Sequence, residues 1–368
     1  MRDSTGVTVP GGSLSALVAR LFVAAGIPEQ PARTVADALV EADLEGQPSH
    51  GVMLVEMYVD RILHGSVSAA ATGAVVSDKG AAVVLDAGHA LGQLTGDQAI
   101  AIAVERARQH GAGIVAVRHG FHFGTARRFA IKAANVDCIG IVMCNTRLLM
   151  PAPSGAERAV GNNPIAIAVP TEGPVPIVLD MATSEAAMGK IRIAEKAGEQ
   201  IPPSWAVRPD GAPTTDPAEA IAGMLLPAGG PKGFGLALVI DLICGLLSGG
   251  ASGAAVKPLY GDPAVPYDSS HLFIAIDVAH FGDPAVFRAA ATATAERIRA
   301  GRRAPGVGRL FVPGEPEWCR RECAAGKVHL APAVAEMLVR LAQELGVSAT
   351  PLGHDNQASM QEPGHAKA

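Results

Sequence analysis

A glycine-rich turn that leads into a long apolar segment is the part of the sequence best suited to hold an anion. Residues 229–233 read Gly-Gly-Pro-Lys-Gly, and the apolar run 234–247 that follows is broken only by Asp241 and two glycines. Glycines leave the N–H groups at a helix start uncrowded, and these groups act with the helix dipole to favour negative charge. The alternative is a flexible loop with a solvated lysine, and these residues alone do not decide between the two.

Two turns that carry histidine could perform acid–base chemistry. His50 begins a predicted helix between Pro48 and Gly51, and imidazole is the side chain whose ordinary pKa lies closest to neutral pH. The turn 118–125, Arg-His-Gly-Phe-His-Phe-Gly-Thr, joins a predicted strand to a predicted helix, a common position for groups that contact a ligand. Histidines without a chemical role are the alternative interpretation of both turns.

A carboxylate at the end of a predicted strand is a third candidate. Asp180 follows the strand 175–179 and precedes a helical stretch that reaches Lys190. A carboxylate in this place could orient an imidazole or bind a sugar hydroxyl. It could also simply cap the helix, and on local grounds capping is the favoured interpretation.

Several motifs that would identify a nucleotide, metal or ester site are absent. No predicted strand is followed by G-x-G-x-x-G with an acidic residue about 20 positions later, so the Rossmann dinucleotide fingerprint is missing. The sequence also contains no G-x-x-x-x-G-K-[ST], no H-E-x-x-H and no G-x-S-x-G. Cys319 and Cys323 are spaced as on one helix face, but no second ligand pair is nearby, so we expect no metal site.

The predicted elements place these candidates on turns of an α/β fold. The chain up to Gly65 is mainly helical, strands and helices alternate from about residue 81, and an amphipathic helix covers 332–345. The run 232–248 is apolar on every side and lacks the ~18 uninterrupted apolar residues of a membrane span, so we predict a buried central helix. Residues 347–368 are polar and rich in glycine and proline, which is typical of a disordered tail.

Composition and charge exclude several classes of function. With 368 residues, 49% of them hydrophobic, the chain is long enough to form a sizeable packed core. A net charge of −5 and the lack of a dense basic patch argue against nucleic-acid binding. The N-terminus has no apolar signal segment and the five cysteines are odd in number, so we expect a cytoplasmic protein with reduced thiols and no membrane segment.

Six short segments occur in the order that a known enzyme family shows, and they span nearly the whole chain before the tail. They are Ser49-His50-Gly51-Val52 with Tyr58 and Arg61-Ile62; His122-Phe123-Gly124; Gly161-Asn162-Asn163-Pro164; Asp180-Met181-Ala182-Thr183-Ser184 through Gly189-Lys190; Leu226-Pro227 with Gly230-Pro231-Lys232-Gly233; and Pro313-Gly314-Glu315. Together they resemble the malate/L-lactate dehydrogenase family of non-Rossmann NAD(P)-dependent oxidoreductases. That family also holds ureidoglycolate, sulfolactate and diketogulonate enzymes and the pyrroline- or piperideine-2-carboxylate reductases.

The resemblance implies a fold and an assembly. It implies an α/β cofactor domain, residues 71–314, with a mixed and mostly antiparallel sheet around the central helix 232–248. A helical domain of residues 8–70, completed by 315–346, would pack beside it, and the protein would be a homodimer.

The resemblance also implies a reaction. Hydride would pass between NAD or NADP and a small 2-oxo or 2-hydroxy acid, with His50 as the acid–base group and Asp180 holding its imidazole. His122 would be a further catalytic residue. The implied cofactor contacts are His122, Phe123, Gly124, Thr125, Asp180, Met181, Ala182, Thr183, Lys190, Lys232, Gly233, Pro313, Gly314 and Glu315.

Two departures from the family pattern affect the substrate side. Many members carry a carboxylate-binding arginine where this chain has Leu54, and Asn162 replaces a threonine. We expect Arg147, in the loop leading to Met150, to supply the missing cation, with Ser49 also on the substrate side. Alternatives are a substrate with a larger apolar part against Leu54, a cyclic imine carboxylate, or a catalytically silent nucleotide-binding protein.

Overall fold

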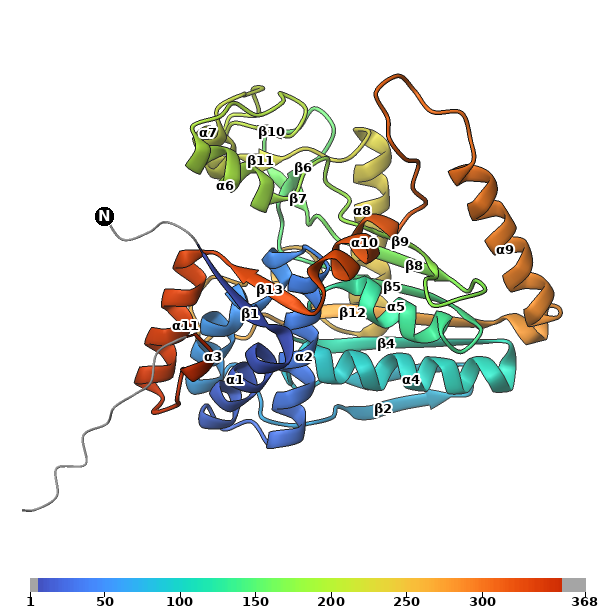
Figure 1. Ribbon diagram of the computed structural model, residues 1–368, viewed down its shortest axis with the longest axis horizontal. Coiled ribbons are helices and arrows are strands. Elements are labelled where there is room, and N and C mark those ends of the chain that lie inside the picture. The colour runs from blue at the N-terminus through green and yellow to red at the C-terminus, as the bar shows by residue number, and fades with distance from the viewer. Residues whose placement is uncertain (1–5, 353–368) are drawn as a thin grey trace, which may run out of the picture.

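A seven-stranded sheet forms the centre of the computed structural model, which describes residues 6–352 (Figure 1). Its strands, in spatial order, are β2 (Ala74–Lys79), β3 (Ala82–Asp86), β4 (Ala112–Gly120), β12 (Ser269–Asp277), β5 (Cys138–Cys144), β8 (Ile165–Val169) and β9 (Ile177–Met181). The pair β3–β4 is parallel and the other neighbours are antiparallel. The predicted α/β class with a mixed, mostly antiparallel sheet is therefore confirmed.

Helices cover the two faces of this sheet differently. The helices α4 (Gly92–His110) and α5 (Ala126–Ala134) pack on one face, and α8 (Pro231–Ser248) packs on the other. Side chains alternate accordingly, because successive residues of a strand point to opposite faces. Val115 and Val117 join the apolar cluster under α4 and α5, whereas Ala116 joins the cluster under α8.

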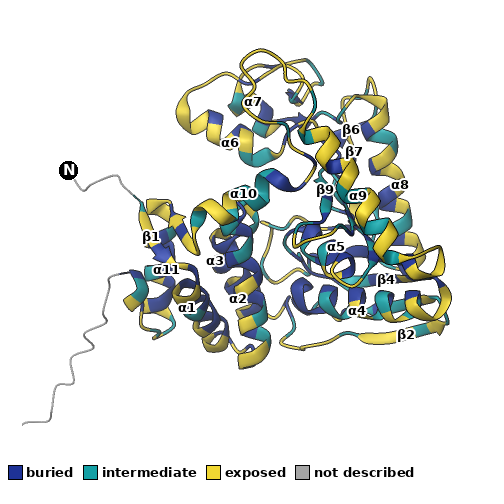
Figure 2. Cartoon of the chain, turned by 45° about the vertical axis from the view of Figure 1, so that its right-hand side comes forward, coloured by how far each residue is buried: buried dark blue, intermediate teal, exposed yellow. Residues whose placement is uncertain are grey.

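The predicted central helix is present at its predicted position, but it is buried on one face only. Ile240 and Cys244 of α8 are 1% and 0% exposed and contact the sheet. The opposite face is open, with Leu242 at 42% and Leu246 at 63% exposed (Figure 2). A helix that is apolar on all sides therefore lies at the surface of this chain, which corrects the expectation of a fully buried helix.

A helical part is built from both ends of the chain. It contains α1 (Gly11–Ala24), α2 (Glu29–Leu44), α3 (Val55–Leu63) and α11 (Pro332–Glu344), whose apolar residues share one buried cluster. The strands β1 (Val7–Pro10) and β13 (Lys327–Leu330) pair beside them, a ribbon that the helical periodicity did not predict. The short 3₁₀ helices η1 (Pro48–His50) and η2 (Val52–Leu54) join α2 to α3.

The predicted disordered tail is corrected at its beginning. Residues 350–352 form the short helix η5 (Thr350–Leu352), and Ala349 and Leu352 are 3% and 6% exposed within the helical cluster. The remaining part of the predicted tail, 353–368, lies outside the described residues.

The remaining elements form a small lobe and an outlying arm (Figure 1). The lobe has its own apolar cluster. It contains β6 (Met150–Pro151), β7 (Arg158–Val160), α6 (Met188–Ala197), β10 (Ala206–Val207), α7 (Pro217–Ala222) and β11 (Met224–Leu225). The arm is α9 (Pro284–Arg299), which a long loop connects to α10 (Glu315–Ala324) at the junction of the helical part and the sheet.

A buried arginine fastens α3 to the loop that precedes β12. Arg61 is 1% exposed, and its guanidinium donates to the carbonyls of Pro258, Leu259 and Val265. Buried polar groups cost free energy unless they are hydrogen-bonded, so these bonds fix the loop against the helix. The loop ends at Tyr267, which thereby lies close to the residues after β4.

Candidate active site

Two histidines from different parts of the fold stack on one another. The rings of His50, at the end of η1, and His122, after β4, lie 5.7 Å apart between centroids and 22° from parallel. The Ser49 hydroxyl lies 3.0 Å from His50 Nδ1. Burial lowers the pKa of His50 below its ordinary value, so its imidazole is neutral at physiological pH. The structure thus brings together two of the predicted catalytic residues.

A buried carboxylate shapes the turn that carries His50. Asp43 Oδ2 accepts a hydrogen bond from the Val52 N–H at 2.8 Å. A side chain at Gly51 would place its Cβ 2.2 Å from Asp43 Oδ1, so the turn requires glycine there. Burial raises the pKa of Asp43 to about 7, against the weaker lowering by the Val52 hydrogen bond. Asp43 therefore changes its charge near neutral pH.

The ring of His122 contacts a tyrosine from the helical part. Its Nδ1 lies 2.7 Å from the Tyr58 hydroxyl, which comes from α3. Burial, followed by the neighbouring His50 and His271, lowers the pKa of His122 to about 3. An imidazole in this environment is uncharged and acts as a hydrogen-bonding group at neutral pH.

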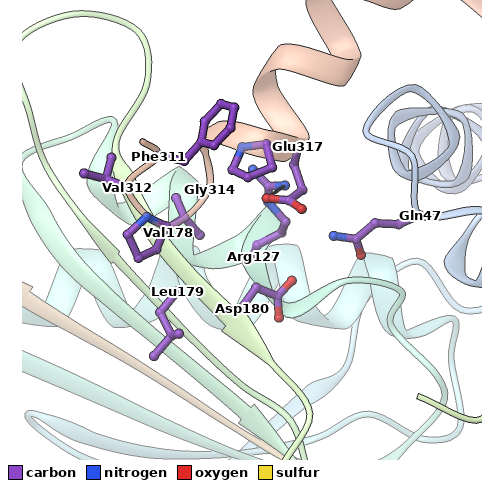
Figure 3. A pocket seen from close by; sticks show the side chains of 11 residues that line it. Gln47, Arg127, Val178, Leu179, Asp180, Phe311, Val312, Gly314 and Glu317 are labelled. Atoms are coloured by element: carbon purple, nitrogen blue, oxygen red, sulfur yellow. Dashed lines mark ion pairs between the residues drawn. The ribbon is translucent and has the colours of Figure 1, made fainter. Parts of the chain in front are cut away.

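A cavity of about 330 Å³ at the junction of the two parts contains several of the predicted cofactor residues. Asp180, Pro313 and Gly314 line it together with Gln47, Arg127 and Glu317 (Figure 3). Segments that are more than a hundred residues apart in the sequence therefore share one cavity.

Asp180 faces Arg127 rather than His50. Burial raises the pKa of Asp180 to about 6, while the Arg127 guanidinium and its backbone N–H lower it. Within residues 6–352 no hydrogen bond joins Asp180 to His50. The predicted contact in which Asp180 holds the His50 imidazole is not formed in this structure.

Arg127 is a site residue that the motifs did not reveal. Its side chain is almost completely buried and lies 3.3 Å from Glu45 and 3.9 Å from Glu317. The sequence did contain a signal, since Arg127 lies at helical spacing from the buried Ala130 and Ala134 of α5. A charged residue on the apolar face of a helix indicates a buried ion pair.

The start of α8 is docked onto the segment that follows β9. The Ala228 N–H donates to the Thr183 carbonyl at 2.9 Å, and the missing Cβ of Gly233 would lie 2.4 Å from the Ala228 carbonyl oxygen. Gly233 is therefore required by packing between protein segments. Around Gly229 and Gly230, by contrast, an added Cβ would meet open space, and no side chain caps the helix.

These features fit a bound dinucleotide. N–H groups at a helix start without a side-chain cap attract phosphate, and the exposed Lys232 adds a positive charge beside them. The Gly229 N–H, just before the helix, donates to Glu185 Oε2 at 3.3 Å. The Thr183 hydroxyl is buried without a hydrogen-bond partner, which a ligand could supply. Lys190, at the start of α6, is exposed, and Met181 and Ala182 are half-buried.

Two predicted cofactor contacts have structural side-chain roles. Phe123 is 2% exposed and packs among Phe129, His271 and Phe273 in the core of the sheet. Glu315 accepts hydrogen bonds from Arg299 at 2.6 Å and from the Val312 N–H at 2.8 Å. Gly124 and Thr125 follow Phe123 at the start of α5 and remain beside His122.

Two predicted substrate contacts are corrected by burial. Leu54 is 1% exposed in the helical cluster, and Met150 is 0% exposed in the cluster of the small lobe. Their side chains have almost no surface to offer a substrate, because both elements turn them toward a core. Asn162 is half-buried and its Oδ1 accepts a hydrogen bond from Thr146 at 3.0 Å.

The predicted substrate cation lies in a positively charged region. Arg147 is half-buried, and burial lowers its pKa, as do the nearby Arg158 and Arg192. The ring of Tyr267 opposes this lowering. No ion pair engages Arg147 within the described part of the chain, so its charge is available to an anion. No three His, Cys, Asp or Glu residues within 6–352 are grouped to hold a metal.

Comparison with known proteins shows similarity along nearly the whole chain. The family model described as malate/L-lactate dehydrogenase matches residues 9–339. A malate dehydrogenase of Pyrococcus abyssi is 37% identical over 321 residues, which cover 85% of this chain and 88% of that relative. The ureidoglycolate dehydrogenase (NAD(+)) of Escherichia coli K12 is 34% identical over 313 residues, covering 85% and 89%. The sulfolactate dehydrogenase structure from Methanocaldococcus jannaschii matches with a TM-score of 0.87 and 33% identity, covering 93% and 98%.

Replacing Asp43 by asparagine should change how stability depends on pH. The folded pKa of about 7 lies above the ordinary 3.8, so the stability from a neutral Asp43 is complete below about pH 4 and is lost as pH rises through 7. Asparagine keeps an acceptor for Val52 and cannot ionise. Urea unfolding should show Asp43→Asn gaining about 2–4 kcal/mol over wild type between pH 5 and pH 8.

The exposed Glu29, on the same helix α2, provides the matched control. Glu29→Gln should follow the wild-type stability profile. If Asp43→Asn also ran parallel to wild type from pH 5 to pH 8, the raised pKa of Asp43 would be wrong.

Proposed function

Because the chain belongs to the malate/L-lactate dehydrogenase family, we propose that it transfers hydride between NAD or NADP and a small 2-oxo or 2-hydroxy acid. The observation that carries this proposal is the stacked pair of imidazoles, His50 and His122, which come together from different parts of the fold. A hydride donor and an acid–base group are the two requirements of this reaction.

The cofactor would lie between the sheet and the helical part. The uncapped start of α8 with Lys232 would bind its phosphates, and Asp180 to Thr183 and Pro313–Gly314 would contact the remainder. A bound nicotinamide would donate the hydride to a 2-oxo acid or accept it from a 2-hydroxy acid. The protein's part is to hold the substrate beside it and to exchange a proton.

His50 is the proposed acid–base residue. Its lowered pKa leaves the ring neutral, so it can accept the hydroxyl proton of a 2-hydroxy acid. The same proton returns to the oxygen when the 2-oxo acid is reduced. The five free cysteines fit a reducing compartment such as the cytoplasm.

The activity test follows NADH and NADPH oxidation with pyruvate, oxaloacetate, sulfopyruvate and a cyclic imine carboxylate as substrates. We expect turnover with a 2-oxo acid, and a loss of at least about 100-fold in kcat for His50→Ala. His64→Ala, at an exposed position of the helical part, is the control and should retain activity. Turnover with the cyclic imine alone, or with no substrate, would contradict the proposal.

Arg147→Ala should weaken substrate binding. A charge-assisted hydrogen bond to a carboxylate contributes about 1.5–3 kcal/mol, so we expect the substrate KM to rise about 10- to 100-fold while the cofactor KM stays unchanged. Arg208→Ala removes an exposed arginine that pairs with Asp210 and should leave both constants unaltered. An unchanged substrate KM in Arg147→Ala would mean that another group binds the carboxylate.

We further propose that α8 and the sheet beside it meet a second copy of the chain. Strand register aligns one residue of each strand from β4 to β9 in a single row. The row is Ile114, Ile274, Ile141, Ile167 and Leu179, all half-buried or exposed. It lies on the α8 face, so helix and sheet present a continuous apolar surface of the kind found at subunit interfaces.

A second copy of the chain fits this surface better than a membrane does. By length and composition α8 could cross a bilayer, a property that it shares with core helices. Its Asp241, however, accepts hydrogen bonds from Asn145 and Gly253 and ties the helix to the sheet. A helix held in this way remains part of the folded domain.

Leu242→Asp should separate the proposed dimer. A charge in the centre of an apolar interface costs several kcal/mol on association, so light scattering should report a monomer instead of the wild-type dimer. Leu63→Asp, at a leucine of α3 that is more exposed than Leu242, should remain dimeric. A wild-type protein that is monomeric at micromolar concentration would refute the interface.

A further inference from the structure

A chain of buried hydrogen bonds runs from the start of α4 to the ring of His122. The Gln93 Nε2 donates to the Tyr58 Oη at 3.0 Å, and this oxygen lies 2.7 Å from His122 Nδ1. Gln93 and Tyr58 are both 0% exposed. The Gln93–Tyr58 bond is fully buried and the Tyr58–His122 bond is partly buried, so this pattern of bonds influences the state of the ring.

The direction of the chain decides which nitrogen of His122 carries the proton. The Tyr58 oxygen receives the Gln93 N–H, and its own hydrogen is left to donate. Two patterns satisfy this hydroxyl: it donates to His122 Nδ1 at 2.7 Å, or it donates to the His122 carbonyl at 3.2 Å while its oxygen accepts from Nδ1–H. Donation to Nδ1 would use the shorter of the two contacts. When Nδ1 accepts, the neutral ring bears its hydrogen on Nε2.

The surroundings oppose a positive charge on this ring. The titratable groups that face it are His50 from η1, Tyr58 from α3 and His271 from β12. None of them is an anion, since burial raises the pKa of Tyr58 above its ordinary value. The first turn of α4 docks on the Phe121–His122 backbone, which brings the positive end of the helix dipole close.

Building on the dehydrogenase function proposed above, we propose that Gln93 and Tyr58 are positioning residues that hold His122 as a neutral Nε2–H donor to the substrate oxygen. His50 then exchanges the proton with the substrate, while His122 only donates a hydrogen bond. A neutral imidazole can polarise a carbonyl by hydrogen bonding without releasing its proton. The tautomer of His50 is not fixed in the same way, because its Nδ1 contacts the exposed Ser49 hydroxyl, which can rotate to donate or to accept.

Tyr58→Phe removes the donor and keeps the ring. The packing of this ring against Phe121, 4.9 Å away between centroids, is preserved, so the protein should fold. We expect kcat to fall about 10- to 100-fold with little change in the substrate KM, because the fixed tautomer is lost.

Gln93→Glu is the sharper test, since it reverses the chain without changing its shape. When it is ionised, the introduced carboxylate can only accept, so it would draw the Tyr58 hydrogen away and force His122 to carry its proton on Nδ1. When it is protonated, the introduced carboxyl group can donate as the amide does. Activity should therefore resemble wild type at low pH and disappear as pH rises through the pKa of the new carboxyl, which burial raises.

The control is Gln109→Glu, an exposed exchange of the same type on α4, which should keep the wild-type pH profile. Nitrogen NMR of ¹⁵N-histidine-labelled protein reads the tautomer directly. We expect Nε2–H for His122 in the wild type and Nδ1–H in Gln93→Glu at high pH.

The outcomes separate this inference from the function on which it rests. A wild-type Nδ1–H tautomer, or wild-type kcat across pH 5–9 in both variants, would overturn the inference even if the enzyme turns over. Absence of turnover in the wild type would overturn the function, while the NMR result would still decide the tautomer.

Discussion

One buried guanidinium holds the helical part against the sheet. Arg127 lies between Glu45 at the C-terminal cap of α2, Glu317 of α10 and Asp180 of β9, so a single cation faces carboxylates from three parts of the chain. Burial nevertheless raises the pKa of Glu45 to about 7 and that of Asp180 to about 6. Desolvation of these carboxylates therefore outweighs their attraction to Arg127. Both carboxyl groups at the junction consequently titrate close to neutral pH.

This junction also sets the geometry of the candidate site. His50 belongs to the helical part and His122 to the turn after β4, so their stacking exists only when the two parts are docked. Tyr58 crosses the same boundary, since it extends from α3 to the His122 ring. The chemistry proposed for this pair would thus depend on contacts that neither part could make alone.

Local patterns predicted much of this arrangement, and long-range contacts account for what they missed. Glycine and proline signals singled out His50 and His122, which the structure brings together, because turns of this kind have a local sequence signature. The phosphate-binding role of the turn 229–233 stays a prediction. Burial of Leu54 and the partners of Arg127 are decided by elements distant in sequence. The exposed face of α8 was not predicted for another reason. An apolar residue in a sequence does not show whether its own chain or a second chain covers it.

The pairing of β1 with β13 has a consequence for synthesis of the chain. The ribosome releases the first strand and helices α1 to α3 early, but their partners β13 and α11 come last. The intervening sheet can form first, because its seven strands all lie between residues 74 and 277. The apolar faces of the N-terminal helices stay uncovered until about residue 345 has left the ribosome. The nascent chain is therefore most prone to aggregation, and most dependent on chaperones, at its N-terminal end.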